Sequence, residues 1–355
     1  MWKDRRLIQL FGIEHPIIQA PMGGAAVPSL AAAVANAGGL GSLGTAILPV
    51  EERRRQVDQL RALTNHPINL NYFVHAEPVA EAAWTARLQA RLAAWYAELG
   101  AGEPPAPTAP FQTFDREALE HLLAVCPAVA SFHFGLPSPA DVAAIKAAGI
   151  KLIASATTPQ EARALEAGGV DAVIAQGWEA GGHRGTFAPP YGEGQIGTFA
   201  LVPQVADAVG VSVIAAGGIA DGRGIAAALM LGASAVQLGT AFLSCPEARV
   251  HPLYRQALTE ATRASIVTAA FSGRPARALA NRYAAELADA EADILAFPLQ
   301  ASQTVPLAQA AAARGSSEFM AMWAGQAYRL NRALPAAELV AILAREATAR
   351  LASAV

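Results

Sequence analysis

The chain has 355 residues, of which 53% are hydrophobic, so it is long enough to bury a large core. Its formal net charge of -3 gives no electrostatic reason to expect binding to nucleic acid or to an anionic membrane surface. The two cysteines, Cys126 and Cys245, lie far apart, which is typical of a reducing cytosol and excludes a zinc site built from cysteines. We therefore expect a cytoplasmic globular protein.

The amino-terminal part contains a long uncharged stretch. Residues 1–12 are charged and lack the apolar segment of a secretory signal. Residues 17–50 carry no charged side chain and are long enough to raise the question of a membrane span, but Pro21, Pro28 and six glycines interrupt them. Because buried parallel strands read as continuous apolar runs, we interpret this stretch as strand, helix and strand.

Beyond this point the chain alternates between strand-like apolar runs and helical segments. The expected strands are residues 15–22, 39–44, 67–73, 128–134, 151–157, 172–176, 211–216 and 235–238. The expected helices between them are residues 29–37, 51–63, 140–148, 159–167, 199–209 and 225–231. Eight strands with intervening helices predict an α/β protein with a parallel (β/α)8 barrel, the TIM-barrel architecture.

Two stretches interrupt this alternation. Residues 76–125 combine a helical Ala/Arg/Trp pattern with a proline-rich segment, which predicts an insertion after the third strand. After residue 250 the strand signals nearly vanish and helices dominate, which predicts a small helical cap domain over residues 251–320. We thus expect a barrel domain at 1–250, the cap, and helices at 321–355 that return to the barrel.

Glycines end the last two expected strands, in residues 211–243. Gly217, Gly218 and Gly239 would let backbone N–H groups approach a ligand closely, and bare amides at loops and helix N-termini suit a phosphate. The loops after strands seven and eight form the usual phosphate site of such barrels. In the helix between these strands, we expect Asp221 to be the N-cap and Gly232 to be the C′ residue. An ordinary strand–helix–strand unit with tight turns explains this segment equally well.

Another glycine pattern is not a nucleotide site. Residues 39–44 match GxGxxG, with Asp58 downstream, but a dinucleotide fingerprint must follow a strand and open a helix. Here a helical segment precedes the glycines and the glycines themselves lie on a strand. We therefore do not expect a Rossmann domain.

Polar residues at the expected strand ends are the candidate site. His183 lies among glycines after strand six. Because the ordinary pKa of histidine is near neutral, it is a candidate general base. The simple alternative is an exposed loop histidine. His133 ends strand four, where a buried core histidine is the simple alternative. Gln176 and Asn71 can hydrogen-bond a planar heterocycle. No metal-ligand cluster or nucleophile elbow is present in the sequence, so we expect no metal.

Taken together, several motifs resemble the nitronate monooxygenases. They are QAPMGG (19–24), NAGGLGSLG (36–44), GWEAGGHRG (177–185), AAGGIADGRG (215–224) and QLGTAF (237–242), and SFHFG (131–135) and WAGQA (323–327) resemble the class I branch. The resemblance implies a barrel that binds FMN, with the flavin phosphate at the glycines of strands seven and eight. It maps FMN contacts onto Met22, Asn71, Gln176, Gly181, Gly218, Gln237, Gly239 and Thr240. His183 would act as base or orient the nitro group, and His133 would be a second catalytic histidine.

The implied reaction is the oxidation of alkyl nitronates, such as propionate 3-nitronate, by O2 to a carbonyl compound and nitrite through a flavin semiquinone. The implied partners are this small-molecule substrate and O2, with no nucleic acid or membrane, in a monomer or homodimer. The alternatives are a related FMN barrel reductase that uses NAD(P)H, of the enoyl-ACP or quinone reductase type, and a non-catalytic flavin or phosphate carrier. Some class I members have tyrosines and a lysine where residues 297–305 read FPLQASQTV, and residues 111–114 also lack a tyrosine. These departures affect the expected substrate preference.

Overall fold

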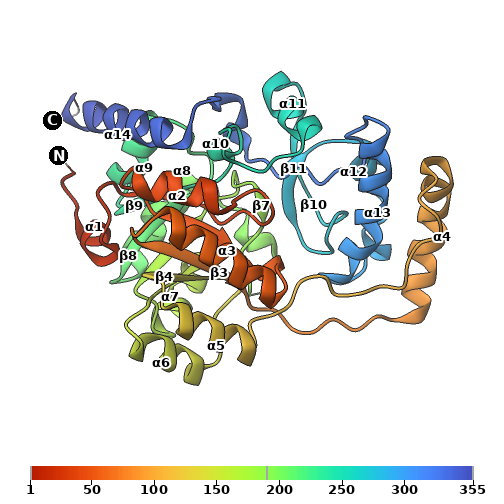
Figure 1. Cartoon of the computed structure of the whole chain (residues 1–355), viewed down its shortest axis with the longest axis horizontal. Helices are drawn as coiled ribbons and strands as arrows, with labels where there is room; N and C mark the ends of the chain where they lie inside the picture. Colours follow the sequence, from red (N-terminus) through yellow and green to blue (C-terminus); the bar gives the residue numbers. More distant parts are fainter. Residues whose placement is uncertain (1, 189–190, 354–355) are drawn as a thin grey trace.

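The computed structural model describes residues 2–188 and 191–353, and an eight-stranded parallel sheet forms its centre (Figure 1). The strands are β1 (Ile17–Gln19), β2 (Gly41–Gly44), β3 (Ile68–Phe73), β4 (Val129–His133), β5 (Lys151–Ala156), β6 (Ala172–Gln176), β8 (Ser212–Ala216) and β9 (Ala235–Leu238). Their order is β1-β9-β8-β6-β5-β4-β3-β2, and a parallel bridge between Ile18 and Leu40 closes the ring. Every strand lies inside its predicted range, which confirms the (β/α)8 barrel.

Helices surround the sheet. They are α2 (Pro28–Asn36), α3 (Val50–Leu63), α5 (Arg116–Val125), α6 (Pro139–Ala147), α7 (Pro159–Ala167), α8 (Thr198–Ala208), α9 (Gly222–Met230) and the C-terminal α14 (Ala336–Ser353), which packs against α9 and α2. Inside the barrel, Leu7 and Phe11 of α1 (Arg6–Phe11) join a separate apolar cluster with Ile153 and Ile214. This packing fills the amino-terminal end of the barrel and leaves its carboxyl end for a site.

Local capping explains where the helix after β8 begins and ends. The carboxylate of Asp221 accepts hydrogen bonds from the backbone N–H groups of Arg223 and Gly224, and Gly232 follows the helix with a φ of 105°. Caps of this kind contribute about 1 kcal/mol each to helix stability. Both capping predictions are confirmed.

The uncharged stretch 17–50 belongs to the barrel. It contains β1, α2 and β2, as predicted, and also a short 3-10 helix, η1 (Thr45–Ile47), which was not predicted. Among residues 2–188 and 191–353, no helix has both the length and the apolar character needed to cross a membrane.

A second unit, which we call the cap (residues 82–99 and 251–320), lies beside the barrel (Figure 1). Besides the predicted helices α11 (Pro252–Glu260), α12 (Arg282–Glu286) and α13 (Leu299–Ala313), it contains two strands that the sequence did not predict, β10 (Ser265–Thr268) and β11 (Ala276–Leu279). Its own hydrophobic core includes Leu92, Phe271 and Leu307. The domain boundaries at 250/251 and 320/321 stay a prediction.

The insertion after β3 divides between the two units. Its first helix, α4 (Ala82–Leu99), packs on α13, where the hydroxyl of Tyr96 donates to the carbonyl of Gln303 at 2.8 Å. The carboxylate of Glu98 accepts two hydrogen bonds from Arg282 at 2.6 and 2.9 Å. Its second helix, α5, returns to the barrel between α3 and α6. The inserted segment is therefore part of the cap as well as of the barrel.

Candidate active site

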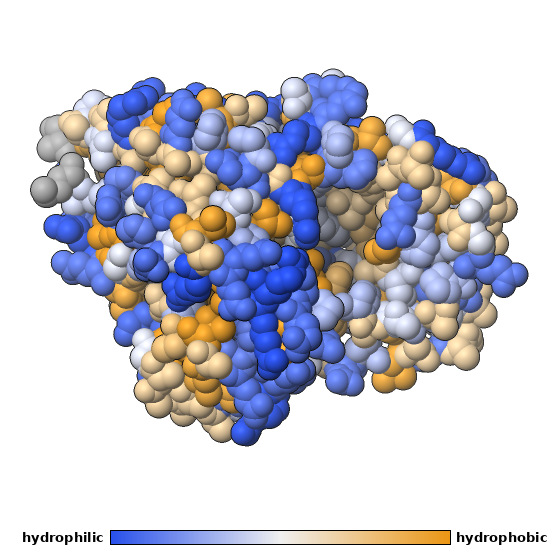
Figure 2. Space-filling model, in the orientation of Figure 1, coloured by the Kyte–Doolittle hydropathy of each residue, from blue (hydrophilic) through white to orange (hydrophobic). Residues whose placement is uncertain are grey.

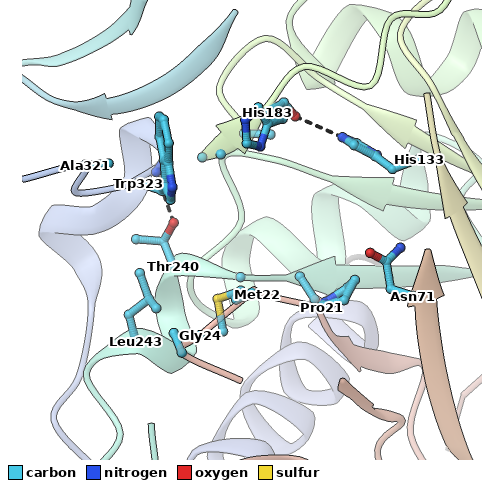
Figure 3. A pocket seen from close by; sticks show the side chains of 18 of the residues that line it. Pro21, Met22, Gly24, Asn71, His133, His183, Thr240, Leu243, Ala321 and Trp323 are labelled. Carbon is cyan, nitrogen blue, oxygen red and sulfur yellow. Dashed lines mark hydrogen bonds between the residues drawn. The ribbon is translucent and has the colours of Figure 1, made fainter. Parts of the chain in front are cut away.

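A cavity of about 540 Å³ lies at the carboxyl end of the barrel, beneath the cap. Its size is typical of small-molecule sites. Figure 2 shows the hollow between the two units from outside. The cavity brings together every site candidate taken from the sequence: Met22, Asn71, His133, Gln176, Gly181, His183, Gly218, Gln237, Gly239 and Thr240. Figure 3 labels Met22, Asn71, His133, His183 and Thr240 around it. These residues come from six segments of the chain and meet because parallel strands end at the same rim.

His183 lies on a short strand, β7 (Gly182–His183), that pairs antiparallel with β11 of the cap. Its Nε2 is 2.9 Å from the hydroxyl of Ser272, and that hydroxyl is also 3.4 Å from the carbonyl oxygen of Arg274. Because the Ser272 proton can go to either acceptor, both neutral tautomers of His183 are satisfied. The loop after β6 is thus fastened to the cap, which the sequence did not predict.

Aromatic rings surround the imidazole of His183. The ring centroids of Trp323 and Phe297 are 5.2 and 5.3 Å from its own, and that of Phe134 is 5.9 Å away. Burial, with smaller contributions from His133 and Arg274, lowers the pKa of His183 to about 3. The imidazole is therefore neutral near pH 7.

His133 supports the backbone of the same loop. Its Nε2 is 3.1 Å from the carbonyl oxygen of His183, which can only accept, so Nε2 carries the proton. Its Nδ1, 3.0 Å from Ser155 Oγ, then accepts from that hydroxyl. Burial lowers the pKa of His133 to about 4. Both ring nitrogens are thus engaged by protein.

Gln176 supports this loop as well. Its Nε2 donates to the His183 carbonyl at 3.0 Å, while its Oε1 accepts from the N–H of Gly185 at 2.8 Å. The side chain predicted to contact a cofactor therefore fixes the position of His183. Asn71 is similarly anchored, because its Nδ2 donates to the carbonyl and hydroxyl of Ser131 at 3.2 and 3.1 Å.

A buried arginine follows His183 directly. Arg184 is 2% exposed and donates to the carbonyl oxygens of Gly177 at 2.6 Å and of Gln176 and Gly194 at 3.0 Å. Burial lowers its pKa to about 10, so it stays charged at neutral pH. The guanidinium of Arg184 therefore connects the end of β6 to Gly194 through hydrogen bonds to backbone carbonyls. No sequence motif indicated this contact.

The glycines after β8 and β9 leave backbone donors uncommitted. Gly217 and Gly218 have φ values of 103° and 71°, which favour glycine. In the part of the chain that the structure describes, the N–H groups of Gly218, Gly239 and Thr240 donate to no protein acceptor. Such free amides at a cavity wall suit an anion.

The helix that follows Gly217 and Gly218, α9, has its first backbone amides engaged by side chains. Its first amides are taken by carboxylates, since Asp221 accepts from Arg223 and Gly224 and Glu346 accepts from Gly222 at 3.1 Å. The expectation that this helix N-terminus offers bare amides is therefore wrong. Any anion site here consists of the amide of Gly218 and those of Gly239 and Thr240, which lie at the start of the short helix α10 (Thr240–Leu243).

Three residues around His183 escaped the sequence analysis. Ser272 and Phe297 lie about a hundred residues further along the chain, in no pattern of spacing that points to His183. Phe297 begins the stretch 297–305 that the sequence analysis linked to substrate preference, but no contact with His183 was predicted for it. Trp323 stands within the WAGQA motif, which identified the family branch but gave the tryptophan no role. For Trp323, the WAGQA motif was the local signal that could have pointed to the site.

The fold and the site define a (β/α)8-barrel enzyme with its active site at the carboxyl ends of the strands. The family model described as nitronate monooxygenase matches residues 4–346. The chain therefore belongs to the nitronate monooxygenase family, as the motifs predicted.

Known proteins agree with this assignment. The chain is 49% identical to a nitronate monooxygenase of Paraburkholderia phytofirmans, over 96% of this chain and 94% of that one. It is 47% identical to a nitronate monooxygenase of Pseudomonas aeruginosa, over 96% and 98% of the two chains. Among solved structures, nitroalkane oxidase from Streptomyces ansochromogenes matches with a TM-score of 0.89 and 40% identity over 99% of this chain and all of that one. FabK from Thermotoga maritima matches with a TM-score of 0.77 and 31% identity over 100% and 99% of the two chains.

Proposed function

We propose that this enzyme binds FMN and oxidises alkyl nitronates with O2 to a carbonyl compound and nitrite. The observation that carries the proposal is the meeting of His183, the free amides after β8 and β9 and an uncommitted glutamine in one cavity. FMN, when bound, supplies the redox chemistry of such a reaction, and the protein supplies position and electrostatics.

The side chains and glycines in the cavity fit a flavin nucleotide. Gln237 Oε1 is buried and has no hydrogen-bond partner among the described residues, so it is an acceptor available to a ring N–H group. The free amides of Gly218, Gly239 and Thr240 are donors of the kind that a phosphate needs. Both kinds of group lie on the barrel side of the cavity, which supports this wall as the cofactor side.

We assign His183 to the substrate. Its ring is neutral, and the hydroxyl of Ser272 allows it to present either a lone pair or an N–H group. The N–H form can hydrogen-bond the oxygens of a nitronate, which is already deprotonated. The lone-pair form would have to take a proton from a neutral nitroalkane, which the low pKa of His183 makes unfavourable. The site is therefore better suited to nitronates than to nitroalkanes.

The aromatic rings around His183 exclude water from this part of the cavity. Phe297 is 9% exposed and Phe134 is 5% exposed, and both lie within 6 Å of the imidazole centroid. A dry environment strengthens the hydrogen bonds that orient a charged substrate. His133 and Gln176, which bind the His183 carbonyl, keep the imidazole in place while this happens.

Oxygen consumption tests the proposal directly. FMN-loaded protein should take up O2 and release nitrite when it is given ethyl nitronate or propionate 3-nitronate, with no nicotinamide present. If the flavin is bound and no O2 is consumed, the proposal is wrong. Anaerobic bleaching of the flavin by NADH or NADPH would then identify a reductase instead.

A further inference from the structure

One helix of the cap gives the cavity its outer wall. Ala301, Thr304, Val305 and Ala308 of α13 all line the cavity. Their spacing of three and four residues places them on one face of the helix. We call this face the cap wall.

The cap wall offers a substrate almost nothing polar. Three of its four side chains are hydrocarbon, and the hydroxyl of Thr304 is engaged inside the cap, where it donates to the carbonyl of Gln300 at 3.1 Å. Its methyl group remains for the cavity. Phe73, Phe111 and Trp323 continue the apolar lining towards His183.

Cations are nearly absent from this lining. Of the described residues that line the cavity, Arg249 alone has a permanently charged side chain, and it is exposed to solvent. Its Nε donates to the carbonyl of Gly24, which lies across the cavity from His183 (Figure 3). Arg274 does not line the cavity, since its guanidinium lies 3.9 Å from the ring centroid of Phe134 and donates to the carbonyl of Thr186. A second negative charge on a substrate would therefore meet no cation on the cap wall.

We propose that the substrate of this site is a nitronate whose carbon chain is uncharged and apolar, with that chain packed against the cap wall. The inference rests on the proposed function, because it places the nitronate group at His183. Moving a carboxylate from water to an unpaired position against hydrocarbon is strongly unfavourable. A methylene group in the same position gains free energy.

Two substrates with three carbons each test this selectivity. Wild-type enzyme loaded with FMN should show a kcat/KM for propyl 1-nitronate at least about tenfold higher than for propionate 3-nitronate. Lengthening the chain to butyl should raise kcat/KM about two- to fourfold. Equal values for the two three-carbon substrates, or a preference for the carboxylate, would overturn the inference.

A lysine in the cap wall should relax the selectivity. Val305 is 47% exposed, so a lysine there can lay its stem on the wall and is not expected to disturb the core. Val305→Lys should raise kcat/KM for propionate 3-nitronate at least about fivefold. The matched control is Gln309→Lys, at an exposed position of α13 that does not line the cavity, and it should leave this value unchanged. Val305→Met, which lengthens the side chain without adding a charge, should not reproduce the gain. An equal gain in Gln309→Lys, or none in Val305→Lys, contradicts the role of the wall.

Calorimetric titration with pentanoate and glutarate separates this inference from the proposed function. One carboxylate of each acid can stand in for the nitronate group, and only glutarate has a second one at the far end. FMN-loaded protein should bind pentanoate at least about tenfold more tightly. If it does so but oxidises no nitronate, the proposed function fails while the selectivity of the cavity stands. If nitronates are oxidised and glutarate binds as tightly as pentanoate, the inference fails and the function stands.

Discussion

His133 binds the backbone of His183 and not its ring. The distance from His133 Nε2 to the His183 carbonyl oxygen is 3.1 Å, and the other ring nitrogen of His133 accepts from Ser155. With both nitrogens occupied, His133 has none free to exchange a proton with a substrate. The arrangement therefore favours a positioning role for His133, whereas the motif had predicted a second catalytic histidine.

Removing this support should lower turnover without affecting the cofactor. His133→Ala should reduce kcat for nitronates at least about tenfold, because the His183 loop loses one of two donors to its carbonyl. FMN affinity should stay within about twofold. His133→Gln, whose amide N–H can reach the same carbonyl, should recover most of the loss. If the glutamine variant is as slow as the alanine variant and its pH profile differs from wild type, His133 acts on protons directly.

His183→Asn should separate the two substrate classes. A nitronate needs no proton removed, so its kcat/KM should fall about tenfold or less, through loss of orientation alone. A neutral nitroalkane requires a base, and its kcat/KM should fall at least about a hundredfold. Rates are measured as O2 uptake with fresh nitronate and with the parent nitroalkane. Equal losses on the two substrates would show that His183 only binds.

The low histidine pKa values also predict a flat pH profile. His183, with a pKa of about 3, and His133, with a pKa of about 4, are neutral throughout the usual assay range. The kcat/KM for a preformed nitronate should therefore show no inflection from either residue between about pH 6 and 9. An inflection in that range that disappears in His183→Asn would contradict this assignment.

Stability should decrease as the solution is acidified below neutral pH. Burial holds the pKa of His121, like that of His133, at about 4 in the folded state, whereas an unfolded histidine titrates near 6.5. Between these values the unfolded chain binds more protons, so the free energy of unfolding falls as pH falls. From pH 7 to 5 the expected loss is about 2 kcal/mol for each such histidine.

Urea unfolding at pH 7 and at pH 5 measures this loss. His121 is 5% exposed and lies outside the active-site cavity, so His121→Gln tests one contribution without disturbing the site. The variant should show a smaller difference in unfolding free energy between the two pH values than wild type does. An identical difference would mean that the pKa of His121 is the same in the folded and the unfolded protein.

The glycines of the cofactor side divide into two kinds. A Cβ at Gly239 would lie 3.4 Å from Ala20 Cβ and 3.6 Å from Met22 Sδ, ordinary contacts that the fold tolerates. It would also occupy space at the cavity wall, so Gly239→Ala should keep the melting temperature and weaken FMN binding about tenfold or more. Fluorescence titration with FMN and a thermal melt check both parts.

Gly217→Ala is the contrasting variant. Gly217 has a φ of 103°, and its added Cβ would lie 2.9 Å from the backbone nitrogen of Ala180. This substitution should lower the melting temperature before any FMN is added. If Gly239→Ala also melts early without FMN, its effect on binding comes from the fold and not from the cavity wall.

The sequence was sufficient for the barrel because most of its strands are short and largely apolar, and they alternate with helical segments at the spacing of a βα repeat. Gln176, for example, ends β6, and Asn71 lies two residues before the end of β3; parallel strands bring their carboxyl ends to one rim. The cap strands were missed for two different reasons. β10 contains the β-branched run Ile266–Thr268, a signal that was available, whereas β11 reads Ala-Arg-Ala-Leu and has none.

Contacts across the two units could not be derived from local pattern. The positions of Ser272 and Phe297 beside His183 depend on how the cap packs on the barrel, and no residue spacing encodes this. The two carboxylates at the start of α9 show the same contrast between a local and a distant contact. A helix cap from Asp221 was predictable from its neighbours, but Glu346 reaches the same helix from α14, more than a hundred residues later.

The pairing of β7 with β11 limits how this protein can be recombined with its relatives. His183 belongs to the barrel by its place in the chain and to the cap by its backbone pairing. A chimera that exchanges residues 251–320 as an independent block would replace the strand against which the His183 segment is aligned, along with Ser272. Such an exchange would have to carry the matching segment around residues 177–188 with it, so in this enzyme the His183 loop and the cap have to be exchanged together.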